Sequence, residues 1–144
     1  MIGNTEIILI DSNILIYAYT EAEPEKKQKA LKILNQCWKK ETQLAISLQN
    51  LAEFFIVVTK KLPNPISIDA ANQIILDIIS FSNWKIIQYD QSALLYAISN
   101  SKGIHFWDAL IASTMIKNNI YKIYTENITD FNKFPNITAI NPFK

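Results

Sequence analysis

A short apolar run stands directly before an acid in the segment Ile7-Ile8-Leu9-Ile10-Asp11-Ser12-Asn13. Four consecutive apolar residues bounded by polar ones predict a short strand that is buried on both faces. Such strands are typical of parallel sheets covered by helices on each side. An acid that follows the strand would lie at the carboxyl edge of the sheet, where open α/β folds bind their ligands.

The rest of the chain continues this alternation of strands and helices. Helices are expected after each strand, where polar or proline residues precede apolar residues at helical spacing. The further strands are expected at 44–46, 85–88, 120–124 and 137–140, and the helices at 14–19, 24–38, 48–60, 69–82, 90–100 and 106–117. This order predicts an α/β fold with a mostly parallel sheet and helices on both faces.

Composition limits the class of protein and of metal site. Hydrophobic residues make up 49% and charged residues 19%, which excludes disorder for the bulk of the chain. We expect a single domain over residues 1–144. The chain has a single cysteine, Cys37, and a single histidine, His105. It therefore has too few of these residues for a disulfide framework or a zinc cluster. A metal would therefore bind to oxygen ligands, which favours Mg²⁺ or Mn²⁺.

Charge and hydropathy suggest which partners and compartment to expect. The net charge is +1, with no Arg, unlike DNA-binding domains that depend on a strongly basic surface. A metal ion can nevertheless supply the positive charge that a phosphate needs. Residues 1–6 contain no Lys, and no apolar run approaches ~18 residues, so neither a signal peptide nor a membrane span is expected. We therefore expect a cytoplasmic protein.

Four acids are candidates for chemistry: Asp11, Glu53, Asp108 and Asp130. Each has a simpler explanation. Asp11 could cap the following helix, and Asp108 could be a first-turn acid that interacts with the helix dipole. Glu53 could belong to a polar stripe of its helix, and the segment Thr125–Phe131 could be a hydrophilic turn. Together, however, three or four carboxylates are what a Mg²⁺-dependent phosphodiester hydrolase requires, provided that the fold brings them together.

Other features are weaker. A lone histidine near a helix start, such as His105, is more often structural than functional. Three tryptophans, Trp38, Trp84 and Trp107, are expected in the core rather than as platforms for nucleobases. Ser12 lacks the partners of a Ser-His-Asp triad, and the chain has no Gly-rich phosphate loop.

At these acids the chain resembles the PIN-domain ribonucleases, and most closely the VapC-type toxins of prokaryotic toxin–antitoxin pairs. The resemblance runs in order over residues 7–143. The segments that carry it are Ile10–Leu15, Ser47–Phe54, Phe106–Ala112 and Thr125–Phe131, with the ending Asn141-Pro142-Phe143. No single motif is specific, whereas the ordered set is.

The resemblance implies a three-layer α/β/α sandwich with about five strands, and Mg²⁺- or Mn²⁺-dependent endonucleolytic cleavage of RNA. Asp11 and Asp108 would bind the main metal ion, while Glu53 and Asp130 would complete the site and orient the water. The resemblance also implies that four further residues contact the metal ligands or the substrate: Asn13, Thr125, Asn127 and Glu126. Of these, Glu126 would either assist the acids or face solvent. The implied state is a homodimer, inhibited by an antitoxin whose C-terminal segment blocks the acidic pocket.

Two alternatives remain at this point. Asp11 could be the nucleophile of an aspartyl-phosphate phosphotransferase or phosphatase, although the haloacid-dehalogenase pattern would place an Asp where Asn13 stands. The chain could also be a PIN-like scaffold that binds RNA or protein without cutting. An acid-labile phosphoryl adduct on Asp11 would favour the former, and unchanged function in Asp11→Asn would favour the latter.

Overall fold

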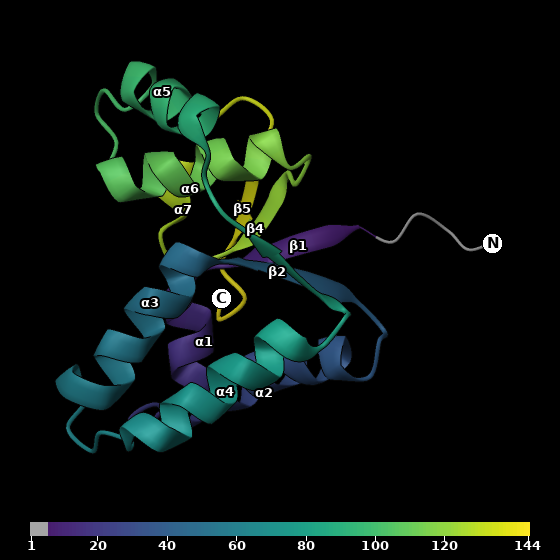
Figure 1. Cartoon of the computed structure of the whole chain (residues 1–144), viewed down its shortest axis with the longest axis vertical. Helices are drawn as coiled ribbons and strands as arrows, with labels where there is room; N and C mark the ends of the chain where they lie inside the picture. The colour runs from purple at the N-terminus through teal and green to yellow at the C-terminus, as the bar shows by residue number, and fades with distance from the viewer. Residues whose placement is uncertain (1–5) are drawn as a thin grey trace.

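The computed structural model describes residues 6–144 and contains the expected parallel sheet (Figure 1). Its five strands are β1 (Ile7–Ile10), β2 (Gln43–Ser47), β3 (Trp84–Ile87), β4 (Lys122–Tyr124) and β5 (Thr138–Ile140). They pair in the order β3-β2-β1-β4-β5, and every pair is parallel. Residues 1–5, which include most of the segment without Lys and the start of the expected domain, lie outside the described residues.

Helices cover both faces of the sheet and give the predicted three layers (Figure 1). One face carries α1 (Ser12–Ala18), α2 (Pro24–Trp38), α3 (Leu48–Ile56) and α4 (Ile68–Ser80). The other carries α5 (Gln91–Ser99), α6 (Phe106–Lys117) and α7 (Ile128–Phe131). The sandwich expected from the sequence is therefore confirmed.

Alternation along the strands sends apolar side chains into two separate cores. In β1, Ile8 and Ile10 pack toward α1–α4, whereas Leu9 packs toward α5–α7. Neighbouring β2 repeats the pattern, with Leu44 and Ile46 on the first side. A strand with apolar residues at every position is thus buried on both faces, which is why β1 reads as a continuous apolar run.

Helix caps place polar residues at the carboxyl edge of the sheet. Asp11 directly follows β1, and Ser47 is the last residue of β2. Each is the N-cap of the following helix. Ser47 forms a reciprocal capping box with Asn50, whose backbone N–H donates to Ser47 Oγ at 2.9 Å. Because the strands are parallel, these caps all lie at the same edge of the sheet.

Two local details differ from the sequence prediction. The helix expected to reach residue 60 ends as an α-helix at Ile56 and continues as a wider π-helical turn, Val57–Lys61. There Thr59 Oγ1 donates to the carbonyl of Phe55, four residues earlier, at 2.6 Å. The segment after β4, for which a hydrophilic turn was one explanation, contains one helical turn, Ile128–Phe131, and its Phe131 is fully buried.

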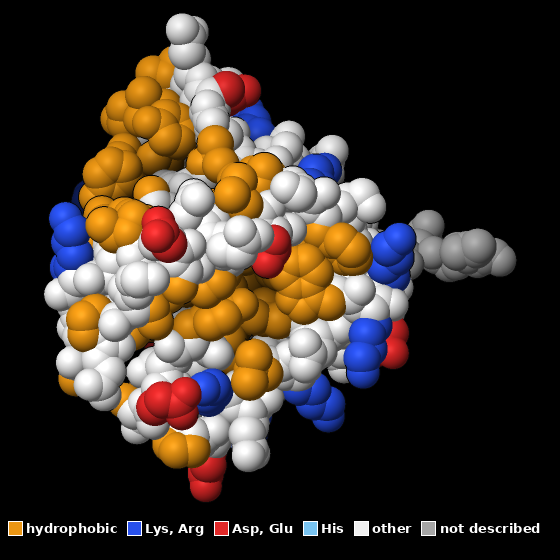
Figure 2. All heavy atoms as spheres, turned by 60° about the horizontal axis from the view of Figure 1, so that its bottom comes forward, with side chains coloured by type: hydrophobic (Ala, Val, Ile, Leu, Met, Phe, Trp, Pro, Cys, Tyr) orange, Lys and Arg blue, Asp and Glu red, His pale blue; other side chains and the backbone are white. Residues whose placement is uncertain are grey.

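Apolar side chains also remain on the surface. Figure 2 shows them gathered across the face that carries α2 and α4. On α4, the exposed fractions are 61% for Ile68, 46% for Leu76 and 47% for Ile79. No helix among residues 6–144 is long and apolar enough to cross a membrane.

Candidate active site

Three of the predicted acids, Asp11, Glu53 and Asp108, line one pocket of about 350 Å³ at the carboxyl edge of the sheet. Asp11 follows β1, Glu53 stands on α3 after β2, and Asp108 lies in the first turn of α6. Asp130 of α7 does not line the pocket but lies beside it, since its Oδ2 accepts from the backbone N–H of His105, which does line it, at 3.2 Å. The fold thus places all four acids in one region.

Asp11 is buried, with an exposed fraction of 6%, and its carboxylate is held by donors from three segments. Oδ1 accepts from Ser12 N at 2.8 Å and from Asn50 Nδ2 at 3.2 Å, and Oδ2 accepts from Thr125 Oγ1 at 2.7 Å. Burial raises the pKa of Asp11, and the charge of Glu53 adds to this, while the bonds from Thr125 and Ser12 oppose it. Asp11 therefore caps α1 and faces the pocket at the same time.

Glu53 is connected to Asp11 through Ser12. Ser12 Oγ donates to Glu53 Oε1, while the Ser12 backbone N–H donates to Asp11. Glu53 itself is exposed and stands at the pocket rim. Ser12, which sequence analysis dismissed as a nucleophile, therefore acts as a bridge between two acids, and its position directly after Asp11 was the only signal for this.

Asp108 is the acid whose protonation the pocket perturbs most clearly. Its pKa is raised to about 7, first by burial and then by the charge of Asp11; His105 opposes this rise, and the charge of Asp130 adds less to it. Asn127 Nδ2 donates to Asp108 Oδ2 and so orients the carboxylate. The Asn127 backbone N–H in turn donates to Thr125 Oγ1 at 3.0 Å. One segment after β4 thus holds both Asp11 and Asp108.

The pKa of Asp130 is shifted in the opposite direction to that of Asp108. Burial alone would raise the pKa of Asp130, but the hydrogen bond from His105 N, the charge of Lys133 and the side-chain bond with Asn127 outweigh it, so the pKa is lowered. Lys133 Nζ lies 3.6 Å from Asp130 Oδ1. Asp130 thus stays ionised beside Asp108, which helps to raise the pKa of Asp108.

The oxygen atoms that line the pocket are of the kind that bind a divalent cation. The pocket lining contains three carboxylates and no Lys, and none of these three takes part in an ion pair within residues 6–144. Asn13, also in the lining, has a buried Oδ1 for which the described structure offers no hydrogen-bond donor. Oxygen ligands of this kind are those that Mg²⁺ and Mn²⁺ prefer.

The carboxylates stand around the pocket without closing on one point. In the part of the chain that the structure describes, no three His, Cys, Asp or Glu side chains are arranged to hold a metal ion. Hydrogen bonds hold Glu53 to Ser12 and Asp108 to Asn127. The acids therefore share a pocket, but they do not form a ready-made coordination shell.

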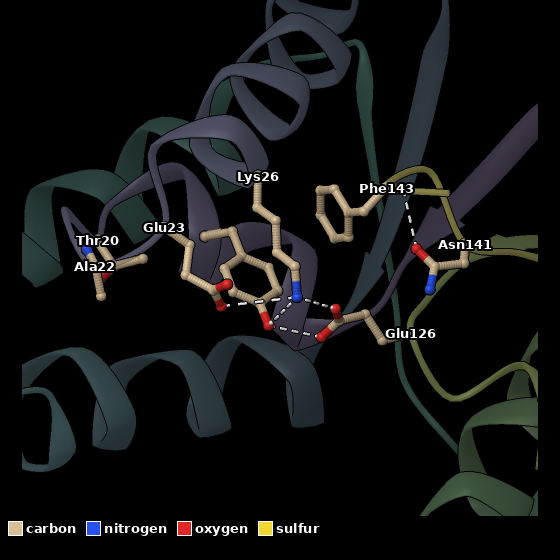
Figure 3. A network of polar contacts seen from close by, with 8 residues as sticks. Thr20, Ala22, Glu23, Lys26, Glu126, Asn141 and Phe143 are labelled. Carbon is tan, nitrogen blue, oxygen red and sulfur yellow. Dashed lines mark hydrogen bonds and ion pairs between the residues drawn. The ribbon is translucent and has the colours of Figure 1, made fainter.

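Glu126 lies outside the pocket lining, in a separate network (Figure 3). Tyr17 OH donates to Glu126 Oε1 at 2.7 Å, and Lys26 Nζ donates to Oε2 at 2.6 Å. The Lys26 ammonium also lies over the rings of Tyr17 and Phe143, 4.7 Å and 5.6 Å from their centroids. The pKa of Glu126 is lowered because these bonds outweigh the effect of burial. The network ties α1, α2 and the C-terminal segment to the residue between Thr125 and Asn127.

Two further residues of the site were missed or misplaced by sequence analysis. Asn50, which was not among the candidate residues, is buried and donates a hydrogen bond to Asp11. Trp107 was expected in the core, yet it is 53% exposed and lines the pocket, whereas Trp84 is buried as expected. Trp107 precedes Asp108, so its position beside a candidate acid was the available signal.

Comparison with known proteins agrees with the fold. A family model described as PIN domain matches residues 8–136. Among solved structures, VapBC2 from Rickettsia felis bound to a DNA fragment from its promoter is 27% identical, with a TM-score of 0.62 and coverage of 94% of this chain and 98% of that chain. No curated protein matches the sequence.

Two more distant structures share the fold. A toxin–antitoxin complex from Klebsiella pneumoniae is 22% identical, with a TM-score of 0.59 and coverage of 94% and 97% of the two chains. VapC20 of Mycobacterium tuberculosis, described as a toxin that cleaves the sarcin–ricin loop, is 15% identical, with a TM-score of 0.64 and coverage of 90% and 96%. Since the family model spans most of the sequence and the fold agrees, the chain belongs to the PIN domain family.

Proposed function

We propose that the protein is a divalent-metal-dependent endoribonuclease and the toxin of a toxin–antitoxin pair. The observation that carries the proposal is the convergence of Asp11, Glu53 and Asp108 on one pocket without a neutralising Lys. The pocket lies where the strand order reverses, between β1 and β4, which is the usual ligand site of open α/β sheets. Membership of the PIN domain family supports the same activity.

Asp11, Asp108 and Glu53 would hold the metal ion, with Asp130 beside them and Asn13 Oδ1 as a further oxygen ligand. When bound, Mg²⁺ or Mn²⁺ neutralises the phosphate and lowers the pKa of the attacking water. The chain's own residues prepare this arrangement. The donors on Asp11 partly offset the effect of burial on its pKa, and Asn127 orients Asp108. At the rim, Glu53 Oε1 accepts from Ser12 and leaves Oε2 to orient the water.

An antitoxin is the proposed protein partner, and a second copy of the chain the proposed homodimer. The solved structures support the first, since the Klebsiella pneumoniae structure is described as a toxin–antitoxin complex. The exposed apolar residues of α4, Ile68, Leu76 and Ile79, support a partner that covers apolar surface. An antitoxin segment that fills the acidic pocket would inhibit by excluding RNA.

The test compares wild type, Asp11→Asn, Asp108→Asn and the control Asp69→Asn on tRNA and mRNA, with and without Mg²⁺. Asp69 matches Asp108 as a first-turn acid but lies on α4, away from the pocket. Cleavage is expected only from wild type and Asp69→Asn, and only with metal. Cleavage in EDTA, or at wild-type rate by both pocket variants, would reject the proposal. An acid-labile phosphoryl adduct on Asp11 would instead favour phosphotransfer.

A further inference from the structure

A second pocket, of about 460 Å³, continues from the acidic pocket along the carboxyl edge of the sheet. The two pockets share Gln49 and Trp107 in their linings. The second one lies at the ends of β2 and β3, where it is also lined by Leu48, Gln88 and Tyr89. Within the described part of the chain, residues 6–144, its lining contains no charged side chain. A molecule that reaches from one pocket into the other thus passes from carboxylates to aromatic and amide groups.

The lining suits a flat, uncharged group with hydrogen-bonding edges. Trp107 and Tyr89 are 53% and 43% exposed, so their rings are accessible. The side-chain amides of Gln49 and Gln88 can each donate and accept hydrogen bonds. Aromatic rings stack on unpaired bases, and amides pair with base edges. No positive group of the described residues lines this pocket, so the phosphate of a nucleotide would lie at the acidic pocket, where the proposed cation would neutralise it.

The same two helices build both pockets, which fixes the distance between them. The first turn of α3 supplies Gln49 and its second turn supplies Glu53. The first turn of α6 supplies both Trp107 and Asp108. Gln49 Nε2 lies 3.5 Å from the carbonyl oxygen of Trp107, so the two helix starts are in contact. The Trp107 ring also packs edge-on against Phe106, with 5.6 Å between the ring centroids.

We propose that this second pocket holds an unpaired RNA base next to the scissile phosphodiester, stacked on Trp107 and contacted by Gln49. The inference rests on the proposed nuclease function for the identity of the acidic pocket. It restricts the substrate to single-stranded or looped RNA, because a base in a duplex cannot leave its stack without cost. It also predicts that one nucleotide position beside the cleavage site matters more than the others.

The test measures binding and cleavage separately for wild type, Trp107→Ala and Trp107→Phe. The probe is a short single-stranded RNA with Mg²⁺, and a duplex of the same sequence is the comparison. Stopped-flow tryptophan fluorescence follows binding before cleavage, since Trp107 is the tryptophan with the exposed ring. Leu95→Ala serves as the control, because Leu95 is 63% exposed on α5 and lies outside both pockets.

We expect single-stranded RNA, and not the duplex, to quench the wild-type fluorescence. Trp107→Ala should raise KM about tenfold and leave kcat within about twofold, as stacking energies on aromatic side chains suggest. Trp107→Phe should restore KM but lose the quench. An RNA that lacks one base beside the cleavage site should have a higher KM with wild type, whereas its KM with Trp107→Ala should not change. Leu95→Ala should behave as wild type in every measurement.

Different failures separate the two proposals. If cleavage persists but Trp107→Ala changes neither KM nor the dependence on that base, the base pocket is wrong and the nuclease stands. If Trp107→Ala instead converts a dimer to a monomer in sedimentation, without base dependence, the pocket is an interface between copies and the inference is overturned. If RNA binds with the predicted quench and base dependence but is never cut, the nuclease proposal fails and the base pocket stands.

Discussion

Replacing Asp108 by Asn should stabilise the metal-free protein at neutral and alkaline pH. Burial and the charges of Asp11 and Asp130 raise the pKa of Asp108 to about 7 in the folded chain, from an ordinary value of 3.8. The folded state therefore binds the Asp108 proton more tightly than the unfolded state does. This contribution to stability is fully present below about pH 4 and is lost as the pH rises through about 7. Asn carries no charge, so the stability of Asp108→Asn does not fall with this pH change.

The expected magnitude follows from the displaced pKa. A change from 3.8 to about 7 corresponds to about 4 kcal/mol if all of it is expressed as folding free energy. Because Asp108 is only partly buried, solvent screening reduces this to about 1–2 kcal/mol. Losing a negative charge from the first turn of α6 costs about 0.3–1 kcal/mol in the opposite direction. A net stabilisation of about 1 kcal/mol remains at about pH 8.

Urea unfolding in EDTA at about pH 5 and about pH 8 measures the effect. The gap between Asp108→Asn and wild type should widen as the pH rises, while Asp69→Asn, the matched first-turn control on α4, should be slightly destabilised at both. Mg²⁺ should then stabilise wild type more than Asp108→Asn, since only a site with its ligands gains from the cation. A destabilised Asp108→Asn at about pH 8, or a gap that does not change with pH, would refute the electrostatic argument.

Three other substitutions or treatments test separate parts of the molecule. Glu126→Gln weakens the network with Lys26 and Tyr17, so it should raise the Mg²⁺ concentration for half-maximal cleavage severalfold with little change in the maximal rate, which a metal titration measures. Asn50→Ala removes a buried donor to Asp11 and a capping box, and should cost about 1–3 kcal/mol in urea unfolding. Burial raises the pKa of the Cys37 thiol, so labelling by a thiol reagent should be slow in the native protein and fast in urea; rapid native labelling would contradict the packing of α2.

Sequence predicted the features that depend on strand ends, and missed those that depend on tertiary contacts. The parallel strands bring Asp11 and Thr125 to one edge, so their position after apolar runs was sufficient to place them together. Glu126 pairs with Lys26, which is 100 positions away, and nothing local in either segment marks that contact. The exposure of Trp107 likewise depends on how α6 meets α3, and helical spacing alone does not reveal it.

The two explanations of Asp11, helix cap and metal ligand, turn out to be compatible rather than alternative. An ionised carboxylate has about four acceptor positions. Ser12 N and Asn50 Nδ2 occupy those of Oδ1, whereas Oδ2 receives only Thr125 Oγ1 among the described residues. Oδ2 therefore keeps one acceptor position for a cation in the pocket that Asp11 lines. The donors that cap α1 also fix the carboxylate in place, so a cation would bind an acid that is already oriented.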